Sequence, residues 1–117
     1  MPKKFIKSVS YARAGAEHAF RTQRNMCLHF FIGLVVIALA VWLKVSILEI
    51  CILILTIFGV LAAETFNTSI EELVNMISPS HRKEAGVVKN IAAAAVLFAA
   101  IGAAVIGWLI FYPRLIK

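Results

Sequence analysis

Residues 46–75 read SILEICILILTIFGVLAA followed by ETFNTSIEELVN. The first part is apolar, and the second turns polar mainly on one side. In a continuous helix four polar side chains share one face, here called the polar stripe: Glu64, Asn67, Glu71 and Asn75. Acids at the end of a membrane span are costly, so the stripe is a candidate functional site. The alternative is structural: a helix simply turns polar as it leaves the membrane. That alternative explains Glu72, which lies off the stripe, as well as it explains Glu71.

The composition is typical of a membrane protein. Of the 117 residues 62% are hydrophobic, and the mean hydropathy is +0.91. A soluble domain of this length could not bury so much apolar surface. Three apolar runs, residues 28–43, 46–63 and 91–111, approach or reach the roughly 20 residues that a membrane span requires. The sequence predicts an all-α membrane protein, one domain over residues 1–117, with transmembrane helices near 26–44, 46–77 and 87–112.

The first 24 residues have a helical pattern of their own. Between residues 5 and 24, apolar and small side chains recur at spacings of three and four, with basic side chains among them. This predicts an amphipathic helix on the membrane surface. A positively charged anchor that only sets orientation is the alternative.

Three signals delimit the second and third spans. Ser46 and Glu49 fit a capping box, which gives Glu49 a structural role. Ser78-Pro79 should end the second span, because the residue before a proline avoids helical geometry. Residues 80–86 should form a loop, and the third span should start near Val87 and end before Pro113.

The basic residues predict the orientation. Nine of the twelve Lys and Arg precede the first span or lie between the second and third spans. By the positive-inside rule, the N-terminus and the 78–90 segment are cytoplasmic and the C-terminus is outside. Trp42, Trp108 and Tyr112 then lie at the outer interface, where aromatic residues are enriched. The membrane explains the net charge of +6, and we expect no nucleic-acid partner.

The residues favour no familiar soluble active site. The chain has no Asp, no glycine-rich phosphate loop and no Cys/His spacing typical of zinc. The predicted cytoplasmic side carries carboxylates, amides and cations, which suit Mg²⁺ and polyphosphate. Phosphoryl transfer and a passive helix bundle are both open on these grounds. His29 could titrate or bind a ligand, but a satisfied interfacial histidine is the preferred interpretation. The small-residue series from Ala95 to Gly107 favours close helix packing or an oligomer.

The chain resembles the small prokaryotic diacylglycerol kinases and undecaprenol kinases. The most specific part is ETFNTSIE at residues 64–71, which matches the family pattern E-x-x-N-[ST]-[AS]-I-E. Lys89-Asn90 and the alanines after it resemble K-D-x-x-[AS]-[AG]-A. Arg24-Asn25 with His29 resembles the E-R-N-x-x-x-H segment of the Gram-positive members, and residues 110–115 are similar to that branch.

The resemblance implies a homotrimer with one surface helix and three transmembrane helices per subunit, and active sites shared between subunits. It implies transfer of the ATP γ-phosphate, with Mg²⁺, to the hydroxyl of diacylglycerol or undecaprenol at the cytoplasmic face of the bacterial inner membrane. Glu64 resembles the general base, Glu71 the magnesium ligand and Asn67 a supporting residue. The residues implied at the ATP and metal sites are Tyr11, Gln23, Glu71, Ser80, His81, Arg82, Lys89 and Asn90.

Three amides stand where the family usually has acids. Gln23 replaces the second metal ligand, Asn75 an acid after the signature, and Asn90 the acid after the lysine. Each amide keeps the shape and loses the charge, so metal affinity should fall. Three outcomes stay open: an active kinase with adapted ligands, a weakened kinase, or a catalytically silent membrane bundle that binds lipid or nucleotide.

Overall fold

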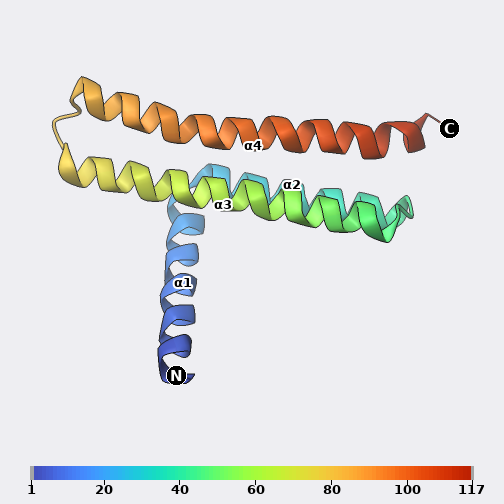
Figure 1. Cartoon of the computed structure of the whole chain (residues 1–117), viewed down its shortest axis with the longest axis horizontal. Helices are drawn as coiled ribbons and strands as arrows, with labels where there is room; N and C mark the ends of the chain where they lie inside the picture. Colours follow the sequence, from blue (N-terminus) through green and yellow to red (C-terminus); the bar gives the residue numbers. More distant parts are fainter. Residues whose placement is uncertain (1, 117) are drawn as a thin grey trace.

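The structure, a computed structural model, describes residues 2–116, and within them the only regular elements are four helices (Figure 1). The expected all-helical class is thereby confirmed. Three of the helices are long and apolar enough to cross a membrane. In chain order the helices are α1 (Pro2–Thr22), α2 (Arg24–Trp42), α3 (Ile47–Ile77) and α4 (Lys83–Leu115).

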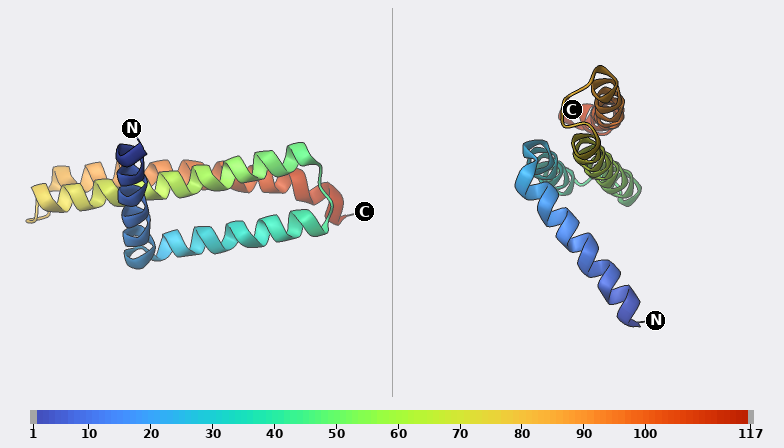
Figure 2. Two further views of the ribbon diagram at one scale, coloured as in Figure 1. Left: turned by 90° about the horizontal axis from the view of Figure 1, so that it is seen from below. Right: turned by 90° about the vertical axis from the view of Figure 1, so that its left-hand side faces the viewer.

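Helix α3 is the centre of the fold, because it contacts each of the other three helices. Helices α2, α3 and α4 form an up-and-down bundle, and α1 leaves it at a steep angle (Figures 1 and 2). We call the end with residues 78–82 the loop end and the end with residues 43–46 the turn end. Figure 2 shows α3 and α4 running past the corner between α1 and α2 towards the loop end.

The corner between α1 and α2 is a single non-helical residue, Gln23, whose backbone is extended (φ −115°, ψ 111°). Two contacts hold it: the Cys27 thiol donates to the carbonyl oxygen of Phe20 at 3.2 Å, and the rings of Phe20 and Phe30 meet edge to face at 5.4 Å. Farther from the corner, His18 of α1 contacts Glu72 of α3. Helix α1 is thus fixed to the bundle by its last turn and a half.

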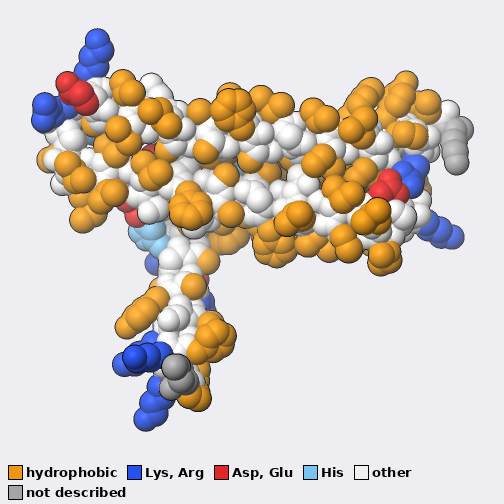
Figure 3. Space-filling view, viewed as in Figure 1, with side chains coloured by type: hydrophobic (Ala, Val, Ile, Leu, Met, Phe, Trp, Pro, Cys, Tyr) orange, Lys and Arg blue, Asp and Glu red, His pale blue; other side chains and the backbone are white. Residues whose placement is uncertain are grey.

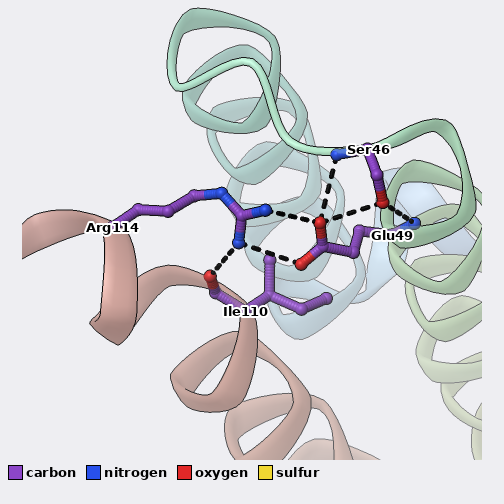
Figure 4. A network of polar contacts seen from close by, with 4 residues as sticks. All are labelled: Ser46, Glu49, Ile110 and Arg114. Atoms are coloured by element: carbon purple, nitrogen blue, oxygen red, sulfur yellow. Dashed lines mark hydrogen bonds and ion pairs between the residues drawn. The ribbon is translucent and has the colours of Figure 1, made fainter.

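The turn end is held by a polar network (Figure 4). The Ser46 hydroxyl accepts from the Glu49 backbone N–H at 3.2 Å, and the Glu49 carboxylate accepts from the Ser46 N–H at 3.1 Å, so the predicted capping box is confirmed. The same carboxylate accepts hydrogen bonds from both terminal nitrogens of Arg114 on α4, at 2.6 and 2.9 Å. Arg114 also donates to the carbonyl oxygen of Ile110 at 2.8 Å. One side chain therefore caps α3 and binds α4.

A small apolar core lies beside this network and consists of Ala40, Leu53, Ile110 and Phe111. Towards the loop end, Gly33 of α2 lies close to Ile57 of α3. A Cβ atom at that position would lie 2.8 Å from Cγ2 of Ile57. The glycine is therefore needed for the spacing between the two helices.

Helix α4 is longer at both ends than expected. It begins at Lys83, so the loop comprises residues 78–82 instead of 80–86, and it continues through Pro113 to Leu115. The early start follows from an extended Arg82 at the N-cap and the acid Glu84 in the first turn, which favours a helix N-terminus; Gly86 costs only about 1 kcal/mol relative to Ala inside a helix. Pro113 lies in the last turn, where it removes one backbone hydrogen bond, and the anchoring of Arg114 holds the turn in place.

The surface matches a protein that lies in a bilayer. Lys and Arg side chains gather at the two ends of the long body and along α1, and hydrophobic side chains cover the flank between them (Figure 3). The rings of Trp108 and Tyr112 stack at 4.4 Å near the turn end.

Glu49→Gln should lower the thermal midpoint of the detergent-solubilised protein, because it removes the charge that binds Arg114 and weakens the cap of α3. The measurement is helix content by circular dichroism during heating. The matched control is Glu17→Gln, which breaks an exposed pair with Arg13 on one helix face; such pairs contribute little. Equal midpoints for the two variants would show that the network at the turn end does not stabilise the fold.

Gly33→Ala should destabilise the bundle by about 1 to 3 kcal/mol, because the added methyl group forces α2 and α3 apart. The free energy of unfolding can be measured by titrating the protein in mixed micelles with a denaturing detergent. Gly102→Ala is the control, since a Cβ atom added at Gly102 would meet no neighbouring side chain within 4 Å. A Gly33→Ala protein as stable as the control would mean that the contact between the helices relaxes without cost.

Candidate functional site

The polar stripe lies on α3 towards the loop end, and its depth varies along the helix. Glu64 is 1% exposed and Asn67 is 7% exposed, whereas Glu71 is half-buried and Asn75 is exposed. Thr68 is also buried, and its hydroxyl donates to the carbonyl oxygen of Glu64 at 2.9 Å. The stripe therefore runs from the interior of the bundle out to its surface.

Glu64 is the most deeply buried large side chain described. Its Oε2 atom has no hydrogen-bond partner among the residues of the structure. Among the described residues, the basic side chain within 4.0 Å of that oxygen is His29 of α2, whose Nε2 lies 3.9 Å away. Burying an ionised carboxylate without a partner costs free energy, so a carboxyl group kept in such a place is a candidate functional group. The carboxylate oxygen is therefore a candidate to receive a proton from a substrate.

The next two members of the stripe are joined to each other. The Asn67 amide donates to Glu71 Oε1 at 2.8 Å, and its own carbonyl oxygen, Oδ1, is buried without a partner. A carboxylate beside a free amide oxygen is a donor set that Mg²⁺ accepts. Within residues 2–116, no group of three or more His, Cys, Asp or Glu side chains could hold a metal ion. This part of the stripe therefore fits an ion that takes most of its ligands from a substrate phosphate and from water.

Helix α4 contributes a cation to the outer end of the stripe. Lys89 Nζ donates to Asn75 Oδ1 at 2.5 Å. The neighbouring Asn90 is exposed. The contact places a positive charge on the same face as the two carboxylates, where it could bind a phosphate.

The other residues implied at the nucleotide site are not gathered on the stripe. Tyr11 is 73% exposed on α1. Gln23 is the half-buried residue of the corner, and its side chain does not cap α2. Ser80, His81 and Arg82 lie in the loop, where His81 has a left-handed backbone (φ 57°) and Arg82 pairs with Glu84 at 3.8 Å. In one chain, then, the stripe collects Glu64, Asn67, Glu71, Asn75 and Lys89, but neither Tyr11 nor the loop.

An apolar groove of about 500 Å³ lies over α3 between α2 and α4. It extends from the turn end to the neighbourhood of Glu64. His29 lines its inner end and is one of few polar side chains there. Other lining residues are Gly33, Val60, Ala103, Gly107 and Phe111.

His29 and His18 are the residues whose contacts sequence reasoning missed. His29 was expected to be satisfied at the interface, but it faces an unpartnered carboxylate oxygen. The antiparallel register of α2 and α3 could have indicated this, because the short turn at 43–46 brings the residues near 29 and 64 to a similar depth. Nothing in the sequence indicated the contact between His18 and Glu72, because the direction in which α1 leaves the bundle depends on the backbone of Gln23.

Comparison with known proteins identifies the family. Residues 10–111 match the family model described as prokaryotic diacylglycerol kinase. The chain is 38% identical over 113 residues to a protein named diacylglycerol kinase from Synechocystis sp., which aligns with 96% of this chain and 65% of its own length. It is 36% identical over 112 residues to a protein named undecaprenol kinase from Bacillus subtilis, with 96% and 91% covered. The chain thus spans about two thirds of one relative and nearly all of the other. It belongs to the prokaryotic diacylglycerol kinase family of lipid kinases.

Proposed function

We propose that this protein transfers the γ-phosphate of ATP, with Mg²⁺, to the hydroxyl of a membrane lipid alcohol, diacylglycerol or undecaprenol. The observation that carries the proposal is the buried Glu64, whose unpartnered oxygen lies beside His29 at the inner end of an apolar groove. A lipid hydroxyl that reaches this point meets a base, and groups suited to phosphate lie on the same face of α3.

Glu64 acts on the acceptor. Its carboxylate takes the proton of the lipid hydroxyl as the oxygen attacks the γ-phosphorus, and ADP leaves. Such positioned general bases typically contribute a factor of about 10² to 10⁴. The burial of Glu64 limits the access of water, which would otherwise compete with the lipid as acceptor.

The outer part of the stripe acts on the nucleotide. Glu71 and the free Oδ1 of Asn67 would hold Mg²⁺, which when bound neutralises charge on the transferred phosphoryl group. Lys89 binds phosphate oxygens, for which it exchanges its contact with Asn75. Because Gln23, Asn75 and Asn90 are amides, Glu71 supplies most of the negative charge that the protein itself offers to the metal.

The assembly and its place in the cell are part of the proposal. With nine of twelve basic residues on the N-terminal side of the spans or in the 82–89 segment, the N-terminus and loop end face the cytoplasm and the C-terminus lies outside the bacterial inner membrane. Helix α1 then lies along the cytoplasmic surface. Since one chain does not bring Tyr11 or the loop to the stripe, a homotrimer in which neighbours share a site could complete the nucleotide pocket.

The decisive assay offers radiolabelled ATP, millimolar Mg²⁺ and each lipid alcohol in detergent micelles to the intact protein. Labelled lipid from one acceptor but not the other names the substrate. No transfer to either acceptor by an intact oligomer would leave the silent membrane bundle as the function.

Glu64→Gln should lower turnover by at least about 100-fold and leave ATP affinity unchanged, because the amide keeps the shape of the side chain but cannot take a proton. The measurements are initial rates with saturating lipid and the binding of a fluorescent ATP analogue. Weaker nucleotide binding at unchanged turnover would assign Glu64 to the nucleotide instead of the acceptor.

Gln23→Glu should lower the Mg²⁺ concentration for half-maximal activity if Gln23 reaches the metal. One added charge about 4 Å from a divalent ion in water contributes about 2 kcal/mol, or about 30-fold in affinity. Asn25→Asp adds the same charge two residues along and serves as the control. If both variants titrate with Mg²⁺ like the unmodified protein, Gln23 is not a metal ligand.

A further inference from the structure

The contact between His29 and Glu64 is isolated from the other charged groups. In the described part of the chain, His29 is the only basic side chain within 4.0 Å of the Glu64 carboxylate, and Glu64 is the only carboxylate within that distance of His29. The neighbouring charges have other partners: Glu71 on α3 accepts from Asn67, and Lys89 on α4 donates to Asn75. On α1, His18 contacts Glu72 on a different face of α3.

The burial of Glu64 creates a problem for repeated turnover. In the proposed function, each transfer leaves the acceptor's proton on Glu64. The Glu64 side chain is only 2% exposed, so bulk water cannot readily remove that proton. A second group must take it before the next lipid can react.

His29 meets the requirements for that group. Its side chain is 21% exposed, against 2% for Glu64. It lies in the second turn of α2, next to the corner with α1, which faces the cytoplasm in the proposed orientation, so water can reach it more readily than Glu64. Histidine is also the side chain that exchanges protons most readily between pH 5 and 8. The 3.9 Å separation is longer than a hydrogen bond, as is common for catalytic contacts in the absence of substrate.

We propose that His29 is a proton relay, which takes the proton from Glu64 after each phosphoryl transfer and passes it to water. This inference rests on the proposed function and adds a role for a residue outside the stripe. It also accounts for the place of His29 at the inner end of the groove, where the acceptor hydroxyl would arrive.

The proton balance is simple. During transfer, the O–H bond of the lipid breaks, a bond forms between that oxygen and the γ-phosphorus, and the bond from the γ-phosphorus to the bridging oxygen of ADP breaks. The proton moves to Oε2 of Glu64. Glu64 then gives it to Nε2 of neutral His29, and the imidazolium releases that proton to water, which restores both side chains.

The relay predicts a split between the first turnover and the later ones. His29→Gln should form the first equivalent of phosphorylated lipid at a rate within about threefold of the unmodified protein, because Glu64 starts deprotonated. Its steady-state rate should fall by at least about tenfold, because Glu64 then loses its proton slowly after each transfer. Rapid-quench measurements with radiolabelled ATP and each lipid in micelles give both rates.

His18→Gln is the matched control, since it removes an imidazole from another contact with a glutamate, and both of its rates should stay unchanged. His29→Ala is the second variant, and imidazole added to the buffer should restore its steady-state rate without changing its first turnover. Equal loss of both rates in His29→Gln would mean that His29 only positions Glu64, and no loss of either would remove it from the reaction; each result overturns the relay. No product from the unmodified protein would instead refute the proposed function.

Discussion

The structure depends on the length of α3 and on its contacts with every other helix. At about 1.5 Å per residue, its 31 residues span about 46 Å, which exceeds the roughly 30 Å of a hydrocarbon core. One continuous helix must therefore serve two media. Its apolar part packs against α2 and α4, and its last turns carry the outer end of the polar stripe beyond the corner between α1 and α2. The position of the stripe towards the loop end follows from this mismatch in length.

Much of this could be predicted from the sequence because the signals are local or periodic. The helical face shared by Glu64 and Glu71 follows from spacing alone, and the capping box at Ser46 follows from two residues three apart. The predicted ends of α4 were wrong for the opposite reason. Gly86 and Pro113 are local breakers, but the contact of Arg114 with Glu49, 65 positions away in sequence, holds the last turn. The place of His29 depends on how α2 packs on α3 and was also missed.

The chemistry of the stripe is unusual in its small number of acids. Glu64 lies in the interior, and Glu71 is the one remaining carboxylate on the stripe, because Asn67 and Asn75 are amides. The two acids differ in depth, as their proposed roles require: Glu64, proposed as the base, is buried, and Glu71, proposed as the ligand of a hydrated ion, is half-buried. Asn67 lies between them on the stripe; its amide donates to Glu71 and its carbonyl oxygen has no partner.

The groove between α2 and α4 has a consequence for how a lipid substrate reaches the site. Its two walls belong to helices that each pack on α3, so it is open along its side to the surrounding lipid. A long-chain alcohol could then enter by lateral diffusion within its own leaflet and never cross water. The search for substrate becomes two-dimensional, and the rate of supply would depend on the mole fraction of the alcohol in the bilayer, not on its concentration in the cell.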